Sequence, residues 1–208
     1  MKKGLHSFLR RAEREDLDSI LAWMEDPEFQ YFLYGDEAQS QRQIREKIIL
    51  MLGRTPPAAP PSAIHLLIDS KEEGLLGMIG LQNISWRNRS CSLDIYIGAR
   101  SYRSSILPAV SIFRALEYVF DELNLHRVSS LIYAFNERSW RMMEKSGAKR
   151  ELVLREHIYR NKTLHDAYGY GLLRHEFYAL REKLGAVSGS ISLDAMIKAM
   201  ADDSGDTK

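Results

Sequence analysis

The polar residues best placed for chemistry gather where an apolar segment meets a short predicted helix. The strand-like segment 128–135 runs directly into Asn136, and Ser139 follows three residues later. Asn is a favoured N-cap because its side-chain oxygen accepts a hydrogen bond from the first helical turn. Gly147 closes the helix, since glycine is favoured just past a helix end. Capping alone accounts for Asn136, whereas Asn-x-x-Ser followed by Glu144-Lys-x-Gly147 also indicates a functional site.

Other ionisable and nucleophilic residues supply candidates for proton transfer. Asp94 lies mid-strand on the face opposite Leu93 and Ile95, which makes it our candidate general base, with an ordinary sheet-face carboxylate as the alternative. The histidines are scattered, without the spacing of a zinc pair, and no Gly-x-Ser-x-Gly elbow is present. Cys91, the single cysteine, is interpreted as a buried strand residue. The sequence therefore predicts no metal site.

Hydrophobic periodicity predicts a mixed succession of strands and helices around these residues. Proline content makes 53–62 a loop. In order, we expect a strand at 8–11, a helix from 17 that Pro27 ends, a helix opened by the capping box Ser40–Gln43, strands at 63–69, 75–86 and 90–98, a long helix over 105–123, a strand at 128–135, the short helix, and strands at 151–159 and 164–177. This order is mixed α/β and differs from a doubly wound nucleotide-binding fold.

The order strand, Asn-x-x-Ser, helix and Lys-x-Gly resembles the CoA-pocket segment of the GCN5-related N-acetyltransferases (GNAT). The likeness is greatest to the branch that acetylates the N-termini of ribosomal proteins, and the order of elements fits the family across residues 8–180. The resemblance implies an α/β (α+β) fold with a mixed, mainly antiparallel sheet flanked by helices on both faces. We expect an acyl-CoA N-acyltransferase-like domain over 1–184 and a flexible or loosely packed tail over 185–208.

The family holds the CoA pyrophosphate with Arg/Gln-x-x-Gly-x-Gly/Ala at the start of the long helix, where N–H groups and the helix dipole face the phosphates. When this chain is aligned with that motif, Arg103 matches its first residue, but the glycine positions are occupied by Ser104, Ile106 and Pro108. Pro108 has no N–H to donate, and Ile106 places a branched side chain where a phosphate would sit. Without the resemblance, Ser104 or Ser105 is a helix cap and Pro108 a tolerated first-turn proline.

The resemblance implies a role for each candidate residue. Ser139 would lie near the thioester sulfur as a proton donor, and Asp94 or a water would take the amine proton. The residues expected to hold the co-substrate, acetyl-CoA or another acyl-CoA, are Ile97, Arg100, Arg103, Ser104, Ser105 and Asn136. The residues expected near the acceptor, with solvated hairpin residues as the alternative, are His157, His165 and Asp166.

Composition limits the partners. Lys and Arg number 29 and Asp and Glu 28, so no basic excess points to nucleic acid. The N-terminus lacks the apolar core of a signal peptide, and no apolar run reaches the length of a membrane span, which predicts a cytoplasmic protein. The oligomeric state is not readable from the sequence.

Two functions follow from these observations. The first is an N-acyltransferase that moves an acyl group, acetyl in the main case, from CoA to a primary amine of a small molecule or peptide, by direct attack in a ternary complex. An acyl carrier protein, which lacks the nucleotide diphosphate, is an alternative donor. The second is a non-catalytic GNAT-fold protein that has lost acetyl-CoA binding and acts as a ligand- or partner-binding module.

Overall fold

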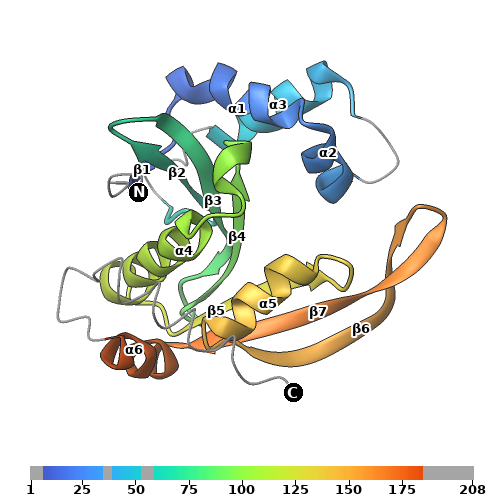
Figure 1. Ribbon diagram of the computed structural model, residues 1–208. Coiled ribbons are helices and arrows are strands. Elements are labelled where there is room, and N and C mark those ends of the chain that lie inside the picture. Colours follow the sequence, from blue (N-terminus) through green and yellow to red (C-terminus); the bar gives the residue numbers. More distant parts are fainter. Residues whose placement is uncertain (1–6, 35–38, 53–58, 185–208) are drawn as a thin grey trace.

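A seven-stranded sheet forms the centre of the computed structural model, which describes residues 7–34, 39–52 and 59–184. The strand order is β1-β2-β3-β4-β5-β7-β6, and every neighbouring pair is antiparallel except β4 with β5 (Figure 1). The strands are β1 (Ser7–Arg11), β2 (Ile64–Ser70), β3 (Gly74–Ser85), β4 (Ser90–Ile97), β5 (Arg127–Tyr133), β6 (Lys149–Arg160) and β7 (Thr163–Leu173). The mixed, mainly antiparallel sheet expected from the sequence is confirmed.

Helices cover both faces of this sheet. The α-helices are α1 (Leu17–Met24), α2 (Pro27–Tyr34), α3 (Gln41–Leu52), α4 (Leu107–Glu117), α5 (Glu137–Lys145) and α6 (Arg174–Lys183). Ile20 and Met24 of α1, with Ile44 and Ile48 of α3, pack on one face. A larger cluster that includes residues of α4, α5 and α6 packs on the other. Figure 1 shows α1, α2 and α3 together at the top and α4 on the opposite side of the strands.

Two of these helices depart from the sequence prediction. Pro27 does end the pattern of α1, but it also begins α2, because proline suits the first position of a helix. The last strand was expected to run to Phe177, and that prediction is wrong beyond Leu173. The chain turns into α6 at Arg174, and the Glu176 carboxylate accepts the Leu173 N–H at 2.9 Å.

The capping box predicted at Ser40–Gln43 is confirmed at the start of α3. The Ser40 N–H donates to Gln43 Oε1 at 3.0 Å while the Gln43 N–H donates to Ser40 Oγ at 3.3 Å, which is the reciprocal capping box. The long helix is shorter than the expected 105–123, since α4 ends at Glu117 and a π-helical turn continues it over Tyr118–Glu122.

Some segments whose structure was predicted from the sequence lie outside the described residues. They include the tail 185–208 and most of the proline-rich loop. None of the helices within the described ranges combines the length and apolar character needed to cross a lipid bilayer.

Candidate functional site

The sheet opens into a wedge between β4 and β5. These parallel strands pair only from Ser90 to Ser92 with Arg127 to Ser129. The buried Ser130 Oγ then donates to the Leu93 carbonyl at 2.6 Å. Beyond this point β4 continues to Ile97 and β5 to Tyr133, but the two strands are no longer paired with each other. The backbone of β4 is therefore available along the wedge to a ligand that can pair with it.

Helix α5 begins at the open end of β5 and brings the two polar residues of the predicted segment together. Asn136 Oδ1 accepts the Ser139 N–H at 3.3 Å, so the predicted N-cap is confirmed. Trp140 Nε1 donates to the Ala134 carbonyl at 3.0 Å and fixes the helix against the end of the strand. Gly147 has φ +83°, the left-handed conformation that a helix-closing glycine adopts.

Asp94 projects from β4 beside the wedge, on the face predicted from the alternation of its strand. Met78 and Tyr96 pack on that face with α1 and α3, whereas Leu93 and Ile97 belong to the other core. Asp94 is exposed to solvent on one side, and the protein around it partly desolvates its carboxylate. This desolvation raises the pKa of Asp94 to about 6. Asp94 is thus a carboxylate whose pKa suits general base catalysis near neutral pH.

The corner before α4 is closed by its own hydrogen bonds. Ser105 Oγ donates to the Tyr102 carbonyl at 2.7 Å and accepts the Leu107 N–H at 3.1 Å. Pro108 lies in the first turn of α4 and has no N–H. The N-cap position of α4 is Ile106, so the predicted serine N-cap is wrong; Ser105, one residue earlier, accepts the Leu107 N–H instead. This corner therefore offers fewer free N–H groups than a glycine-rich loop.

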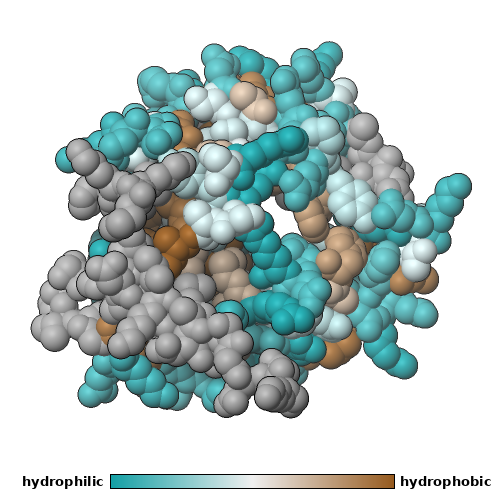
Figure 2. Space-filling model, in the orientation of Figure 1, coloured by the Kyte–Doolittle hydropathy of each residue, from teal (hydrophilic) through white to brown (hydrophobic). Residues whose placement is uncertain are grey.

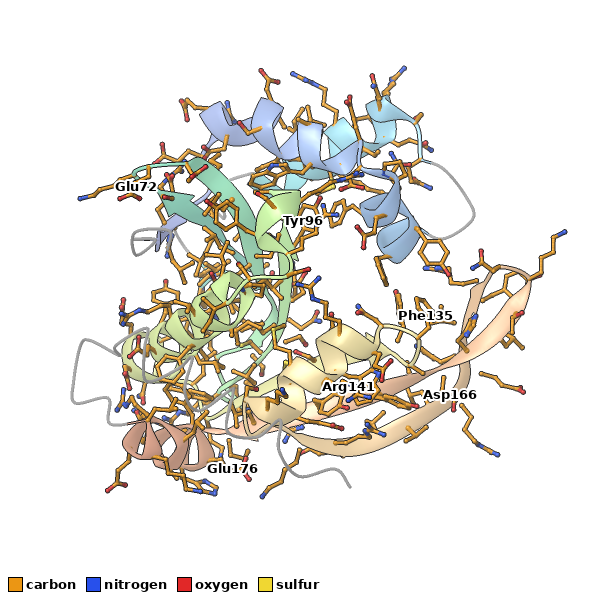
Figure 3. The ribbon with its side chains drawn as sticks, viewed as in Figure 1. Glu72, Tyr96, Phe135, Arg141, Asp166 and Glu176 are labelled. Atoms are coloured by element: carbon orange, nitrogen blue, oxygen red, sulfur yellow. The ribbon has the colours of Figure 1, made fainter. Side chains whose placement is uncertain are left out.

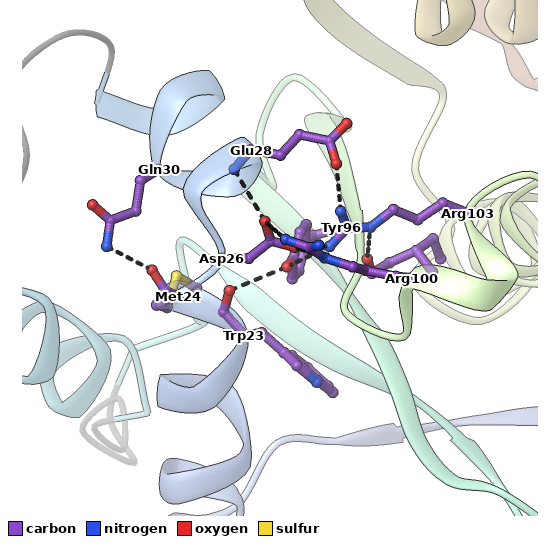
Figure 4. A network of polar contacts seen from close by, with 9 residues as sticks. Trp23, Met24, Asp26, Glu28, Gln30, Tyr96, Arg100 and Arg103 are labelled. Carbon is purple, nitrogen blue, oxygen red and sulfur yellow. Dashed lines mark hydrogen bonds and ion pairs between the residues drawn. The ribbon is translucent and has the colours of Figure 1, made fainter.

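Arg100 and Arg103 are paired within the protein (Figure 4). Arg103 donates to Asp26 at 2.5 Å, to Glu28 at 2.6 Å and to the Ile97 carbonyl at 2.9 Å. Arg100 donates to both oxygens of Asp26, at 2.8 and 3.0 Å. The Arg100 and Arg103 guanidinium groups hold the pKa of Asp26 below its usual range. We name this set of four side chains the Asp26 network; it joins the α1–α2 connection to the predicted phosphate corner.

Tyr96 belongs to the same region and was not predicted from the sequence. Its hydroxyl accepts from Arg103 at 3.1 Å and donates to the Trp23 carbonyl at 3.2 Å. Phe29 of α2 packs at a tilt against its ring, with a centroid distance of 3.6 Å. Burial raises the pKa of Tyr96 to about 12, so the phenol stays protonated. The sequence feature that marks this region is Gly98, two residues after Tyr96. The Trp23 ring packs directly on it, and a Cβ at residue 98 would lie 2.3 Å from that ring.

Aromatic residues of α2 meet the β6–β7 hairpin across the end of β5. Phe135 lies 5.9 Å from Tyr31, 6.0 Å from Phe32 and 5.0 Å from His165, measured between ring centroids. Asn161 at the hairpin tip donates to Tyr31 Oη at 3.0 Å. Figure 2 shows a hollow between these elements, and in Figure 3 Tyr96 and Phe135 lie on opposite sides of it. His165 thus packs against Phe135 at the edge of this aromatic group.

The other two residues expected near the acceptor have different positions. The His157 side chain is exposed on β6. Asp166 Oδ1 accepts the Glu156 N–H at 2.9 Å, where the β6–β7 register is interrupted and Glu156 has φ 52°. The Asp166 carboxylate therefore stabilises a bulge. Within the described ranges, no cluster of three or more His, Cys, Asp or Glu side chains has a metal-binding arrangement.

Comparisons with known proteins place this arrangement in a family. The family model described as an acetyltransferase (GNAT) domain matches residues 7–149. An uncharacterized N-acetyltransferase of Bacillus subtilis, YoaA, is 30% identical over 51% of this chain and 58% of its own length. YdaF of the same organism, provisionally named a ribosomal N-acetyltransferase, is 31% identical over 50% of this chain and 56% of its own length. The chain thus spans little more than half the length of these relatives.

A solved structure extends the likeness to most of the fold. Spermidine N-acetyltransferase from Vibrio cholerae, in complex with CoA and spermine, superposes with a TM-score of 0.71 over 83% of this chain and 98% of that chain. Sequence identity is 22%, so this likeness concerns the fold alone.

Proposed function

This chain belongs to the GNAT acetyltransferase domain family, and from that premise we propose that it transfers an acyl group from CoA to a primary amine. The observation that carries the proposal is the β4–β5 wedge, with Asp94 on one strand and the start of α5 at the end of the other. Relatives named as N-acetyltransferases support this activity over the non-catalytic alternative.

The donor would lie in the wedge. Its pantetheine arm carries amides that can pair with the exposed edge of β4 up to Ile97, and Asn136 and Ser139 would face it from α5. Ser104 and Ser105 at the corner before α4, with the outer edge of Arg100, would meet the phosphates. Arg100 retains 68% side-chain exposure, so it can approach a phosphate more readily than Arg103 at 15%. An acyl carrier protein would present the same arm without the nucleotide.

The reaction is a direct displacement in a ternary complex. Asp94, or a water that it polarises, takes one proton from the acceptor ammonium and leaves a neutral amine. The amine lone pair forms the new C–N bond at the thioester carbonyl, and the C–S bond breaks with its electron pair on sulfur. The attacking nitrogen loses its second proton as the amide forms, and the sulfur gains a proton, so that CoA leaves as the free thiol. Ser139 would donate a hydrogen bond to the sulfur and relay this proton to it.

The acceptor would enter through the hollow lined by aromatic rings. The structural neighbour from Vibrio cholerae binds spermine together with CoA, which supports a small-molecule amine; a peptide N-terminus is the second option. His165 lies closest to that path among the three acceptor candidates, since it packs against Phe135. His157 and Asp166 would contact the acceptor from the edge of that path. Residues up to 184 would form the catalytic domain, with the tail outside it.

A cytoplasmic location suits this activity. Cys91 is a free, buried thiol on β4, and burial raises its pKa to about 12. A chain whose one thiol is held protonated in the core is compatible with a reducing compartment.

Calorimetry with acetyl-CoA tests the proposal directly. We expect binding heat and, in a second assay, release of free CoA thiol with at least one member of a panel of polyamines, aromatic amines and N-terminal peptides. Absence of binding up to millimolar acetyl-CoA together with absence of thiol release would contradict the function. Binding without release across the panel would favour the non-catalytic alternative.

Restoring the family motif at the corner is expected to tighten acetyl-CoA binding. Ile106→Gly removes the branched side chain, and Pro108→Ala returns an N–H to the first turn of α4. One added hydrogen bond to a charged group is worth about 1.5–3 kcal/mol, so the dissociation constant should fall roughly ten-fold or more. Calorimetry on the double variant measures this. Unchanged affinity would place the phosphates elsewhere; Val110→Ala on the same helix is the matched control.

A further inference from the structure

A row of polar residues crosses three strands beside the wedge. His65 on β2 pairs with Gly80 on β3, and Gly80 pairs with Asp94 on β4. Their side chains lie on the face where Leu67 and Met78 pack against α1 and α3. The row therefore interrupts an apolar surface: His65 is half-buried, Gly80 is buried, and Asp94 lies at the exposed end of the row.

Gly80 leaves room for the Asp94 carboxylate. A Cβ built at residue 80 would lie 2.2 Å from Asp94 Oδ1 and 3.0 Å from its Cγ. The carboxylate thus leans across β3 into space that any other residue would fill. Glycine inside a strand often marks such a close approach, and here the approaching group is the candidate base.

Gln82 and His65 complete the surroundings of that carboxylate. Gln82 Nε2 lies 3.0 Å from the same Cβ position, so the amide and the carboxylate converge over Gly80. Gln82 Nε2 is also 2.9 Å from His65 Nε2. Burial lowers the pKa of His65, which favours the neutral ring and lets its Nε2 accept from the amide. The second N–H of the amide can then serve Asp94 through one water.

The other groups on this face do not compete for the proton. Tyr96, the next residue on the same side of β4, has its hydroxyl bonded to Arg103 and to the Trp23 carbonyl. Arg10 of β1, which is in register with Leu67, is bonded to Asp16 and Asp69. The apolar residues that α1 and α3 pack against this face are Ile20, Met24, Ile44 and Ile48.

We propose that Gly80, Gln82 and His65 form a niche that positions the Asp94 carboxylate to take the proton of the acceptor amine. The niche rests on the proposed function. Gly80 supplies the space, Gln82 supplies the donor, and His65 fixes the orientation of Gln82. None of the three touches the substrates, so they are positioning residues and Asp94 alone exchanges the proton.

A double-mutant cycle tests the niche. Gly80→Ala should push the carboxylate out of place and lower kcat by about 10- to 100-fold, while the dissociation constant of acetyl-CoA stays within two-fold. In an Asp94→Asn background the same Gly80→Ala change should cost nothing further. Gly169→Ala is the matched control, because the atoms nearest its added Cβ belong to the Leu152 side chain on β6. An equal loss of kcat in both backgrounds would show a general distortion of the sheet and overturn the niche.

NMR titration of the Asp94 carboxyl keeps the niche testable apart from catalysis. Gln82→Leu removes the donor and should raise the pKa of Asp94, because a hydrogen bond to the carboxylate favours its charged form. Absence of any change would overturn the niche. If the natural protein transfers no acyl group, the proposed function fails, and this titration alone decides the niche. The titration of Gln82→Leu also tests the niche if Gly80→Ala does not fold.

Discussion

Asp94→Asn is expected to lower kcat/KM by roughly 10²- to 10⁴-fold, the usual contribution of general base catalysis. The amide keeps the size of the side chain but cannot take a proton. The wild-type rate should rise with pH through about 6, where Asp94 ionises, and this limb should be missing in the variant. The measurement is kcat/KM against pH with one amine acceptor.

Stability supplies the internal control for this variant. Desolvation raises the folded-state pKa of Asp94 above its unfolded value, so ionisation favours the unfolded chain as pH rises from about 4 to 6. The melting temperature of Asp94→Asn should therefore improve relative to wild type between pH 4 and pH 7. Lost activity with unchanged relative stability would mean that folding does not raise the pKa of Asp94. Retained activity would remove Asp94 from the mechanism altogether.

Arg103→Ala is expected to destabilise the fold by about 3 kcal/mol, because it leaves partners of a largely buried charge unsatisfied. Arg103 and Asp26 retain only 15% and 9% side-chain exposure. Arg100→Ala is the matched control: it removes the other partner of Asp26 but from an exposed position, and should cost about 1 kcal/mol or less. Urea unfolding of both variants measures the difference.

The same pair of variants separates structure from ligand binding. If Arg103 mainly holds phosphates, Arg103→Ala would match Arg100→Ala in stability and weaken acetyl-CoA binding selectively. The pH dependence adds a second readout. Asp26 has a lowered pKa, so the Asp26 network stabilises the fold above the unfolded pKa of about 4 and loses this effect as pH falls below it. Wild type should therefore lose more stability than Arg103→Ala on acidification to pH 3.

Interactions between residues close in sequence were enough to predict several parts of the site. Asn136 caps α5 because the cap needs only residues three positions apart, and the face of Asp94 follows from the alternation of one strand. The same locality explains the failures. Pro27 both ends one helix and begins the next, and the start of α6 depends on where β7 stops pairing with β5 at Leu173.

Short spacings in the linear chain were sufficient to identify the family, the order of most elements and the residues at the start of α5. The partner of each functional side chain became known from the packed fold. Arg103 pairs with Asp26, 77 residues away, and Asp94 leans over Gly80 beside Gln82 and His65. Such contacts arise when strands and helices pack, and no local pattern encodes them.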